Sequence, residues 1–353
     1  MSAATTHDTL ALSVLDIVPV TRGQASRDAI AASMAQAELA DRLGYRRFWF
    51  AEHHNTESVA ATNPAVLIGI AAARTSRIRI GSGGVMLPNY APFSVAEQFA
   101  TLEAAAPGRI DLGLGRSSGS DPVSAYLLGT NRHVAGEFAD HVSTLSALLD
   151  PAGAQVRLAN GGSHDVRVTP LATGRPDIWM LGSSPGSASL AAQLGIPYVY
   201  AHHFFERGTL DALDRYRAEF QPSAALDAPL AIVTANVVVA ETEEEARMAA
   251  LPNLLQLARI ETGRPLPMFE TVEHAAAIAP TVAEADHLEA IRRRWFIGRA
   301  EDVEDRLMSF AADLGVTEIM VAPSSGWRET DDRTRVSSRE TTLRQLADRM
   351  LTG

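Results

Sequence analysis

Short runs rich in β-forming residues alternate with helical runs along almost the whole chain, and this alternation restricts the possible fold more than any other feature. Eight such runs are predicted as strands: residues 10–18, 46–51, 77–85, 109–115, 177–181, 197–201, 230–240 and 317–322. A doubly wound sheet would need fewer strands and usually has a glycine-rich turn after the first one. The pattern is instead typical of an α/β fold of the (β/α)8, or TIM barrel, type.

The segments between these strands carry apolar residues at helical spacing. The predicted helices cover residues 26–43, 64–73, 93–106, 134–149, 185–194, 209–220, 300–314 and 341–350. Ser26 is predicted to be the N-cap of the first of them. Two segments interrupt the alternation. Residues 155–169 are expected to form a hairpin that turns around Asn160, and residues 263–294 to form a helical insertion before the last strand.

The amino-acid composition excludes several classes of protein. The chain has no cysteine and no lysine, since all 31 basic residues are arginine. This excludes disulfides, thiol nucleophiles, a pyridoxal-phosphate Schiff base and a Walker-A phosphate loop. The formal net charge of −11 offers no basic face for a nucleic acid. Because no signal peptide or membrane-spanning stretch is evident, we expect one cytoplasmic domain over residues 1–353 with no membrane or nucleic-acid partner.

Polar or glycine-rich residues follow the second and third predicted strands, at the end of a barrel where active sites form. The second strand ends in Glu52-His53-His54-Asn55. An imidazole there could act as a base or as a hydrogen-bond donor, although a histidine in a polar loop often has neither role. The third strand runs into Gly81-Ser82-Gly83-Gly84. These glycines would let a flat ring lie on the backbone, or would form a bulge that barrel curvature requires.

Three further strand ends carry groups that suit a ligand. Arg116 follows the fourth strand among small hydroxyl residues, and a guanidinium there suits a phosphate or carboxylate. Ser183 and Ser184 precede a helix whose free N–H groups would add to an anion site, although most such serines only cap the helix. The sixth strand ends in His202-His203-Phe204. This second histidine pair leaves a metal-dependent barrel hydrolase as an alternative, although H-x-H and H-E-x-x-H patterns are absent.

Five stretches of the chain together resemble the bacterial luciferase-like flavin monooxygenases. They are FWFAEHHN (48–55), NPAVLIGIAAARTSRIRIGSGGVMLP (63–88), PGRIDLGLGR (107–116), MLGSSPGSASLAAQLGIP (180–197) and FIGRAEDVEDRL (296–307). Each stretch alone is a weak signal, but their joint order and spacing are specific for that family. The resemblance implies that an FMN-type cofactor lies over the mouth of the barrel.

The resemblance also implies roles for single residues. His53 matches the first histidine of the family's E-H-H motif, which lies beside the reacting part of the flavin. Gly83 and Gly84 match a pair whose peptide bond is typically cis and supports the isoalloxazine. The positions that match or adjoin the family's phosphate-binding residues are Arg116, Ser184, Ser187 and, where luciferase has an acid, Ser183.

The activity implied by the resemblance is oxygenation of a small organic substrate by reduced FMN (FMNH2) and O2, through a C4a-peroxyflavin. A separate flavin reductase would supply the FMNH2, because no second nucleotide-binding domain is evident in this chain. His53 would act as a base or hydrogen-bond donor near the reacting flavin. The residues expected to wall the substrate pocket are Phe48, Trp49, Glu52, Met86, Phe204 and residues 263–294. Family members are commonly dimeric, which implies a homodimer.

One residue departs from luciferase, which has a cysteine where this chain has Gly115. The missing thiol argues for an ordinary monooxygenase or reductase rather than for light emission. Some family members use the deazaflavin F420, which forms no oxygen adduct, but the Glu52-His53-His54 motif favours FMN. An FMN- or F420-dependent enzyme that transfers hydride, and a flavin-binding protein without catalysis, stay open as alternatives. Barrel loops vary freely on a fixed scaffold, so the substrate does not follow from the sequence.

Overall fold

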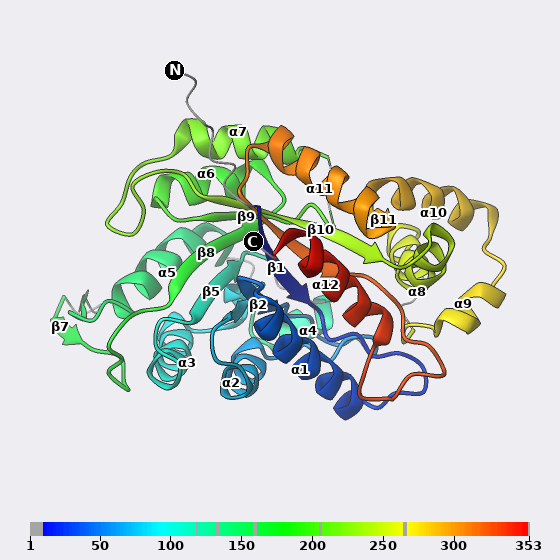
Figure 1. Ribbon diagram of the computed structural model, residues 1–353. Helices are drawn as coiled ribbons and strands as arrows, with labels where there is room; N and C mark the ends of the chain where they lie inside the picture. Colours follow the sequence, from blue (N-terminus) through cyan, green and yellow to red (C-terminus); the bar gives the residue numbers. More distant parts are fainter. Residues whose placement is uncertain are drawn as a thin grey trace, which may run out of the picture.

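Eight parallel strands close into a barrel in the computed structural model, which describes residues 10–117, 119, 121–130, 134–157, 161–204, 207–263 and 267–351. In their order around the ring they are β1 (Ala11–Asp16), β2 (Arg47–Phe50), β3 (Arg79–Ser82), β5 (Ile110–Gly115), β8 (Asp177–Gly182), β9 (Tyr198–Tyr200), β10 (Ala231–Val239) and β12 (Glu318–Pro323). Pairing of β12 with β1 closes the ring. The predicted TIM barrel is confirmed, and every predicted strand corresponds to one of these eight (Figure 1).

Helices connect the strands and surround the barrel (Figure 1). They are α1 (Ser26–Leu43), α2 (Pro64–Arg74), α3 (Pro92–Ala105), α4 (Pro122–Leu127), α5 (Val134–Leu148), α6 (Pro185–Leu194), α7 (Thr209–Glu219), α8 (Glu243–Glu261), α9 (Val272–Ala277), α10 (Val282–Arg294), α11 (Ala300–Leu314) and α12 (Ser337–Met350). Short additional elements are β4 (Val85–Met86), the 3-10 helix η1 (Leu87–Asn89) and β11 (Phe296–Gly298). The segment expected to be a helical insertion contains α9 and α10, which confirms its helical character.

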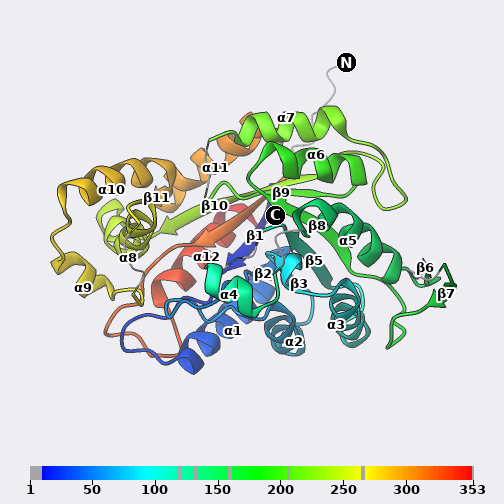
Figure 2. The ribbon, with the colours of Figure 1, turned by 180° about the vertical axis from the view of Figure 1, so that it is seen from behind.

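The two additions to the barrel lie on opposite sides of it. Helices α8 to α10 and β11 gather on one side, and the hairpin of β6 (Ala154–Arg157) and β7 (Ser163–Val166) projects from the other (Figure 2). The predicted hairpin is thus present, while Asn160 of its expected turn lies outside the described residues. The prediction for the start of α1 is wrong, because Ser26 is its first residue and Ala25 is the N-cap. Ala25 has no side-chain oxygen, and its N–H donates to the Asp28 carboxylate at 3.0 Å.

Two indole rings fill the middle of the barrel. Trp49 and Trp179 pack edge to face with their ring centroids 5.5 Å apart. The other members of this inner cluster are Leu15, Val199, Ile232 and Met320. Gly81 leaves room for the Trp49 ring, since a Cβ on this glycine would lie 2.6 Å from Trp49 Nε1. The glycine inside the third strand therefore has a packing reason that involves no ligand.

A buried layer of charged side chains lies below the indoles, at the amino ends of the strands. Asp111 is fully buried and accepts hydrogen bonds from Arg47 Nη1 (2.8 Å), Trp49 Nε1 (2.9 Å) and Arg79 Nε (2.8 Å). Arg47 also donates from Nε to Glu318 at 2.9 Å. Each buried charge in this layer therefore has a partner of opposite sign, which is the condition under which such burial is tolerated.

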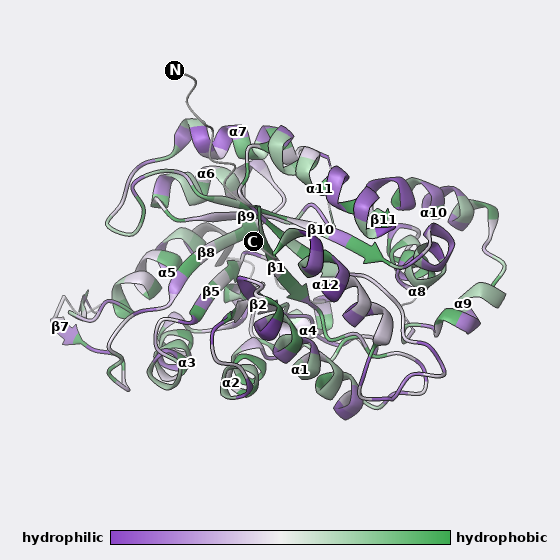
Figure 3. Cartoon of the chain, in the orientation of Figure 1, coloured by the Kyte–Doolittle hydropathy of each residue, from purple (hydrophilic) through white to green (hydrophobic). Residues whose placement is uncertain are grey.

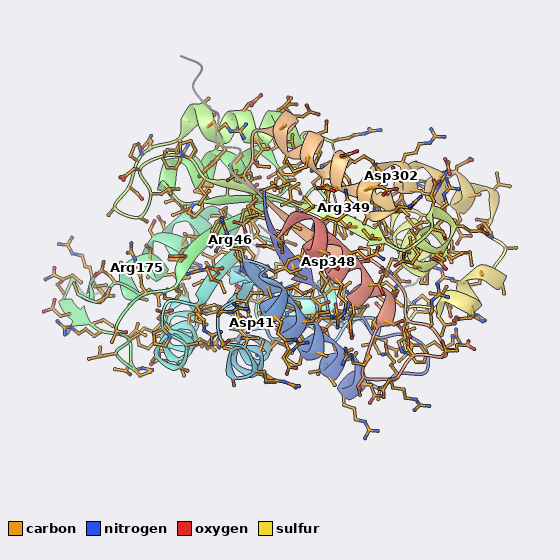
Figure 4. All side chains as sticks on the ribbon, viewed as in Figure 1. Asp41, Arg46, Arg175, Asp302, Asp348 and Arg349 are labelled. Carbon is orange, nitrogen blue, oxygen red and sulfur yellow. The ribbon has the colours of Figure 1, made fainter. Side chains whose placement is uncertain are left out.

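Much of the outer surface of the barrel is polar. Hydrophobic residues follow much of the strands, and hydrophilic residues are frequent in α10 and in parts of α7 and α11 (Figure 3). Charged side chains are numerous over the outer helices (Figure 4). Some of them pair across neighbouring elements, as Arg349 of α12 does with Glu304 of α11. No helix among the described residues is long and apolar enough to cross a membrane.

Candidate active site

A cavity of about 700 Å³ opens at the carboxyl ends of the strands, where a barrel is expected to place its site. Its apolar lining comprises Leu15 and Ile17 near the end of β1, Leu257 and Ile260 of α8, and Phe269 and Trp295. Its polar lining includes His53 and His54 after β2, His203 after β9, Asn236 of β10, Ser324 after β12 and Arg339 of α12. The cavity therefore combines apolar walls with many polar side chains, and a concave site of this kind suits a small molecule.

The two histidines after β2 have different environments. The His53 ring lines the cavity and has no hydrogen-bond partner among the described residues. Burial lowers the pKa of His53, with a smaller effect from the neighbouring His54, so the ring is neutral at pH 7. His54 instead makes a hydrogen bond from Nε2 to Glu52 Oε1 at 2.7 Å. His53 is thus the histidine of this pair whose imidazole is available to bind a ligand.

Glu52 does not wall the cavity, and the expectation that it does is wrong for this structure. Its side chain is fully buried. The carboxylate accepts hydrogen bonds from the Met86 N–H at 3.0 Å and from the Tyr90 hydroxyl at 3.1 Å, in addition to the His54 contact. A buried carboxylate needs such donors, and here they tie the end of β2 to β4 and η1. Glu52 therefore positions the loop that carries His53.

Three other predicted pocket residues also lie elsewhere. Phe48 is fully buried in the core between the strands and the outer helices, and Trp49 lies inside the barrel below the cavity. Adjacent residues of a strand point to opposite faces, which places Phe48 on the outer side of the barrel wall and Trp49 on the inner side. Met86 packs beside Gly115, where an added Cβ would lie 2.8 Å from its sulfur, and it is not part of the cavity lining. Phe204 does line the cavity, as does Phe269 from the insertion.

The Gly83–Gly84 pair lies at the junction of β3 and β4, and its peptide bond is cis. Neither position has room for a side chain. A Cβ on Gly83 would lie 2.5 Å from Leu15 Cδ1, and a Cβ on Gly84 would lie 2.7 Å from the Gly113 carbonyl oxygen. Close packing within the barrel therefore requires glycine at both positions.

Arg116 and the start of α6 meet at the rim of the barrel. Arg116 Nη1 lies 3.6 Å from the position that a Cβ on Gly186 would occupy. Arg116 is exposed and has no carboxylate partner among the described residues. Ser184 is the N-cap of α6, and the Gly186 N–H in the first turn has no acceptor in the described part of the chain. A guanidinium and an unpaired helix N–H thus converge as an anion site of the kind that phosphate occupies.

Ser187 supports this turn from below. It is buried, and its hydroxyl donates to the Ser184 carbonyl oxygen at 2.7 Å and contacts the Tyr198 hydroxyl at 3.1 Å. Because the hydroxyl proton is donated to the Ser184 carbonyl, it is not available to an anion. The Ser187 hydroxyl therefore positions the turn, instead of making the expected direct contact with an anion. Ser183 is partly exposed beside the turn, and its carbonyl accepts a hydrogen bond from Tyr200 at 3.4 Å.

The histidine pair after β9 splits between two environments. His203 lines the large cavity, whereas His202 lines only a small neighbouring pocket. Their Nδ1 atoms contact Thr234 Oγ1 at 2.6 Å and Thr209 Oγ1 at 2.8 Å, respectively. Burial lowers the pKa of each to about 4, so both rings are neutral at pH 7. The described residues contain no group of three or more metal-ligating side chains.

Several lining residues were not predicted from the sequence. Asn236 interrupts the apolar run of β10, and an isolated amide near the end of a buried strand is a signal that could have identified it. Arg339 lies in a polar helix far along the chain, and no local pattern distinguishes it from the other arginines. Leu257 and Ile260 of α8 follow the spacing of any apolar helix face, so the sequence does not mark them as cavity residues.

The chain matches proteins of known name over most of its length. A family model described as luciferase-like monooxygenase matches residues 12–318. The chain is 37% identical to a luciferase-like monooxygenase of Escherichia coli (strain K12), covering 90% of this chain and 92% of that protein. It is 32% identical to the N-acetyl-S-alkylcysteine monooxygenase of Bacillus subtilis (strain 168), covering 88% and 91%. The crystal structure of apo-MsnO8 is 35% identical and matches with a TM-score of 0.83 over 96% of this chain and 98% of that one.

More distant structures share the fold. The oxygenating constituent of 3,6-diketocamphane monooxygenase of Pseudomonas putida, in complex with FMN, is 18% identical with a TM-score of 0.72 over 97% of each chain. An F420-dependent secondary alcohol dehydrogenase is 15% identical with a TM-score of 0.66 over 96% of this chain and 99% of that one. At these identities the likeness shows the barrel fold alone.

Proposed function

This chain belongs to the luciferase-like monooxygenase family, and from that membership we propose that it is a flavin-dependent enzyme that uses reduced FMN and O2 to oxygenate a small organic substrate. The observation that carries the proposal is the position of the Arg116–α6 anion site at the same end of the barrel as the cavity that His53 lines. The anion site suits a cofactor phosphate, and the cavity suits a flat ring with an apolar substrate.

The donor set fits the phosphate of FMN. Arg116 would pair with the phosphate charge, and the Gly186 N–H and the Ser184 hydroxyl at the start of α6 would add hydrogen bonds. An exposed arginine without a carboxylate partner loses no existing ion pair when an anion binds. These residues would therefore hold the phosphate without rearranging the described ion pairs.

A bound reduced flavin would supply the electrons and the oxygen chemistry, and this chain would supply a shaped, water-poor site. Leu257 and Ile260 of α8, together with Trp295, form an apolar wall of the cavity. The neutral His53 ring offers one N–H donor and one acceptor nitrogen to the reacting groups. Glu52 holds that loop in place through its contacts with His54 and Met86.

We favour FMN over F420 and propose a separate reductase as its source. The FMN complex at a TM-score of 0.72 and the F420-dependent enzyme at 0.66 show that this fold accommodates either cofactor. The E. coli and B. subtilis relatives described above, which are 37% and 32% identical, are named monooxygenases, which favours an oxygen-using member. The P. putida protein is described as an oxygenating constituent, and a similar division of labour would leave flavin reduction to another protein here.

We also propose that the protein is a homodimer. Apolar side chains are exposed on the outer face of neighbouring helices α2 and α3, with exposed fractions of 58% for Val66, 41% for Ile70 and 43% for Phe93. A second copy of the chain that packed against this face would bury these side chains.

The proposed function predicts how the protein handles reduced FMN. We expect it to bind FMNH2 without oxygen and, when mixed with air-saturated buffer in a stopped-flow instrument, to delay the return of oxidised-flavin absorbance relative to free FMNH2. Oxygen uptake measured in parallel should equal the FMNH2 added. Binding without any effect on the reaction with oxygen would favour hydride transfer or a flavin carrier. Binding of F420 but not FMN would show that the proposed cofactor is wrong and that F420 is the cofactor instead.

Replacing His53 with asparagine should change the rate of this oxygen reaction by about 100-fold, because acid–base and hydrogen-bonding groups contribute on that order. FMN affinity should change less than about threefold, since the phosphate contacts lie elsewhere. The matched control is His164→Asn, which replaces an exposed histidine of β7. Equal losses in FMN affinity and reaction rate would remove His53 from the reacting centre and make it a binding residue.

A further inference from the structure

His203 stands at the cavity wall with its ring held by a single hydroxyl. Its Nδ1 lies 2.6 Å from Thr234 Oγ1, and its backbone N–H donates to the same oxygen at 3.3 Å. The Thr234 hydroxyl in turn donates to the Tyr200 carbonyl oxygen at 3.2 Å. The ring lines the cavity, and its Nε2 makes no hydrogen bond with a described residue.

Counting the protons indicates one tautomer of this ring when the Thr234 hydroxyl donates to the Tyr200 carbonyl oxygen. A hydroxyl has one proton, and the Tyr200 carbonyl can only accept it. The contact between Thr234 Oγ1 and His203 Nδ1 can exist at the same time only if Nδ1 carries the proton and donates it. A neutral imidazole has one N–H, so Nε2 is then an acceptor without a proton. The lowered pKa of His203, about 4, keeps the ring in this neutral form at pH 7.

The backbone of His203 is also held firmly. Asn236 donates from Nδ2 to the His203 carbonyl oxygen at 2.8 Å, and Ser324 donates to Asn236 Oδ1 at 2.8 Å. Asn236 lies within β10, whereas His203 and Ser324 follow β9 and β12, and these three strands are adjacent in the barrel. The acceptor nitrogen therefore has a defined position in the cavity, as a recognition group requires.

The buried charge near this acceptor is already compensated. Arg339, at the cavity wall, pairs with the buried Asp16 at 3.1 Å. The two carboxylates of the lining are in contact with solvent: Asp121 is partly exposed and accepts a hydrogen bond from Asn55 at 2.9 Å, and Glu57 is exposed. His53, which also lines the cavity, is neutral at pH 7. A charged substrate would find no unpaired buried charge among these groups, whereas an uncharged apolar molecule would meet the apolar walls and the free acceptor.

We propose that His203 Nε2 accepts a hydrogen bond from a hydroxyl or N–H group of an uncharged, largely apolar substrate, and so selects substrates that carry such a donor. The inference rests on the proposed function in placing the substrate in this cavity. A buried acceptor that loses its water and gains no donor costs about 1–3 kcal/mol, which corresponds to roughly 5- to 150-fold in affinity. His203 thereby discriminates against matched molecules without the donor.

The tautomer is tested directly by NMR on the full chain labelled with 15N-histidine, without flavin. Two-dimensional long-range correlation spectra distinguish protonated from unprotonated ring nitrogens, and the signals of His203 are those missing in the His203→Asn variant. We expect a neutral ring with its proton on Nδ1 at pH 7. Thr234→Val removes the hydroxyl that accepts from Nδ1, so in this variant the proton should no longer favour Nδ1 over Nε2. A proton on Nε2 in the wild-type protein would overturn the proposal.

Selection is tested with naphthol and naphthol methyl ether, two uncharged aromatic probes that differ in the hydroxyl donor. We expect the wild-type protein to bind naphthol about tenfold more tightly in calorimetric titrations, and naphthol to shift the Nε2 resonance. The His203→Asn variant keeps an N–H near Thr234 but has no acceptor at the position of Nε2, so the preference should fall below about twofold. His202→Asn is the matched control, because His202 makes a similar threonine contact outside the large cavity.

The outcomes separate this inference from the proposed function. Equal affinity for both probes, binding of neither, or a preference that survives in His203→Asn would overturn the role of His203. None of these measurements uses flavin or oxygen. A protein that selects naphthol but does not bind FMN would therefore retain this inference and contradict the proposed flavin chemistry.

Discussion

Replacing Arg116 with alanine is expected to weaken FMN binding by about 100-fold while leaving riboflavin binding unchanged. The guanidinium lies beside the first turn of α6, where a phosphate would also meet the Gly186 N–H. Two charge-assisted hydrogen bonds from the Arg116 guanidinium to a phosphate would together contribute close to 3 kcal/mol. That free energy corresponds to the expected 100-fold change in FMN affinity. Riboflavin has the same ring system without the phosphate, so it reports on the ring site alone.

The measurement is a titration of each flavin with wild-type protein and with the Arg116→Ala variant, followed by flavin fluorescence. Arg157→Ala is a suitable control, because Arg157 is exposed on the distant hairpin strand β6. Stability should hardly change in either variant, since Arg116 leaves no carboxylate unpaired among the described residues. An unchanged FMN affinity would remove Arg116 from the phosphate site. An equal loss for both flavins would indicate that Arg116 shapes the ring site instead.

Replacing Asp111 with alanine is expected to lower the free energy of unfolding by about 4 kcal/mol. Asp111 is fully buried and accepts hydrogen bonds from Arg47, Trp49 and Arg79. Without this carboxylate, the buried Arg47 guanidinium keeps only Glu318 as a close anion, and the Trp49 N–H loses its acceptor. Uncompensated buried charge and unsatisfied donors are among the largest single causes of destabilisation.

The control for this prediction is Asp177→Ala. Asp177 pairs with the same Arg79 at 2.6 Å, but its side chain is 58% exposed. Exposed ion pairs contribute less than about 1 kcal/mol, so this variant should unfold almost like the wild-type protein. Denaturant unfolding followed by circular dichroism measures both variants. Similar losses for the two would show that the buried layer is not a stabilising unit of the barrel.

Much of the fold followed from local pattern. The order of strands and helices is encoded by apolar spacing and by the residues that start and stop each element, and these act within a few positions of the chain. The strand ends that carry Arg116, Ser184 and His53 were recognisable for the same reason, since polar groups there interrupt otherwise apolar runs. Convergence of Arg116 with the start of α6 also follows, because the carboxyl ends of β5 and β8 are neighbours in the barrel.

The direction of individual side chains was less predictable. Trp49 and Glu52 were expected in the substrate pocket, yet one fills the barrel interior and the other anchors the loop that carries His53. A single step along an extended backbone moves a side chain to the opposite face, so a prediction that places a residue near the strand end does not fix what it touches. The space that Gly81 leaves for Trp49 decides the first case.

Local sequence thus determines which elements form and which strand ends are polar, because hydrogen bonding and burial within one element depend on nearby residues. Only closure of the barrel decides which of those groups share a cavity. Arg339 and Asp16 are 323 positions apart and pair at its wall, and Thr234 fixes the His203 ring from a different strand. Such contacts depend on the packing of distant elements, which no short stretch of sequence specifies.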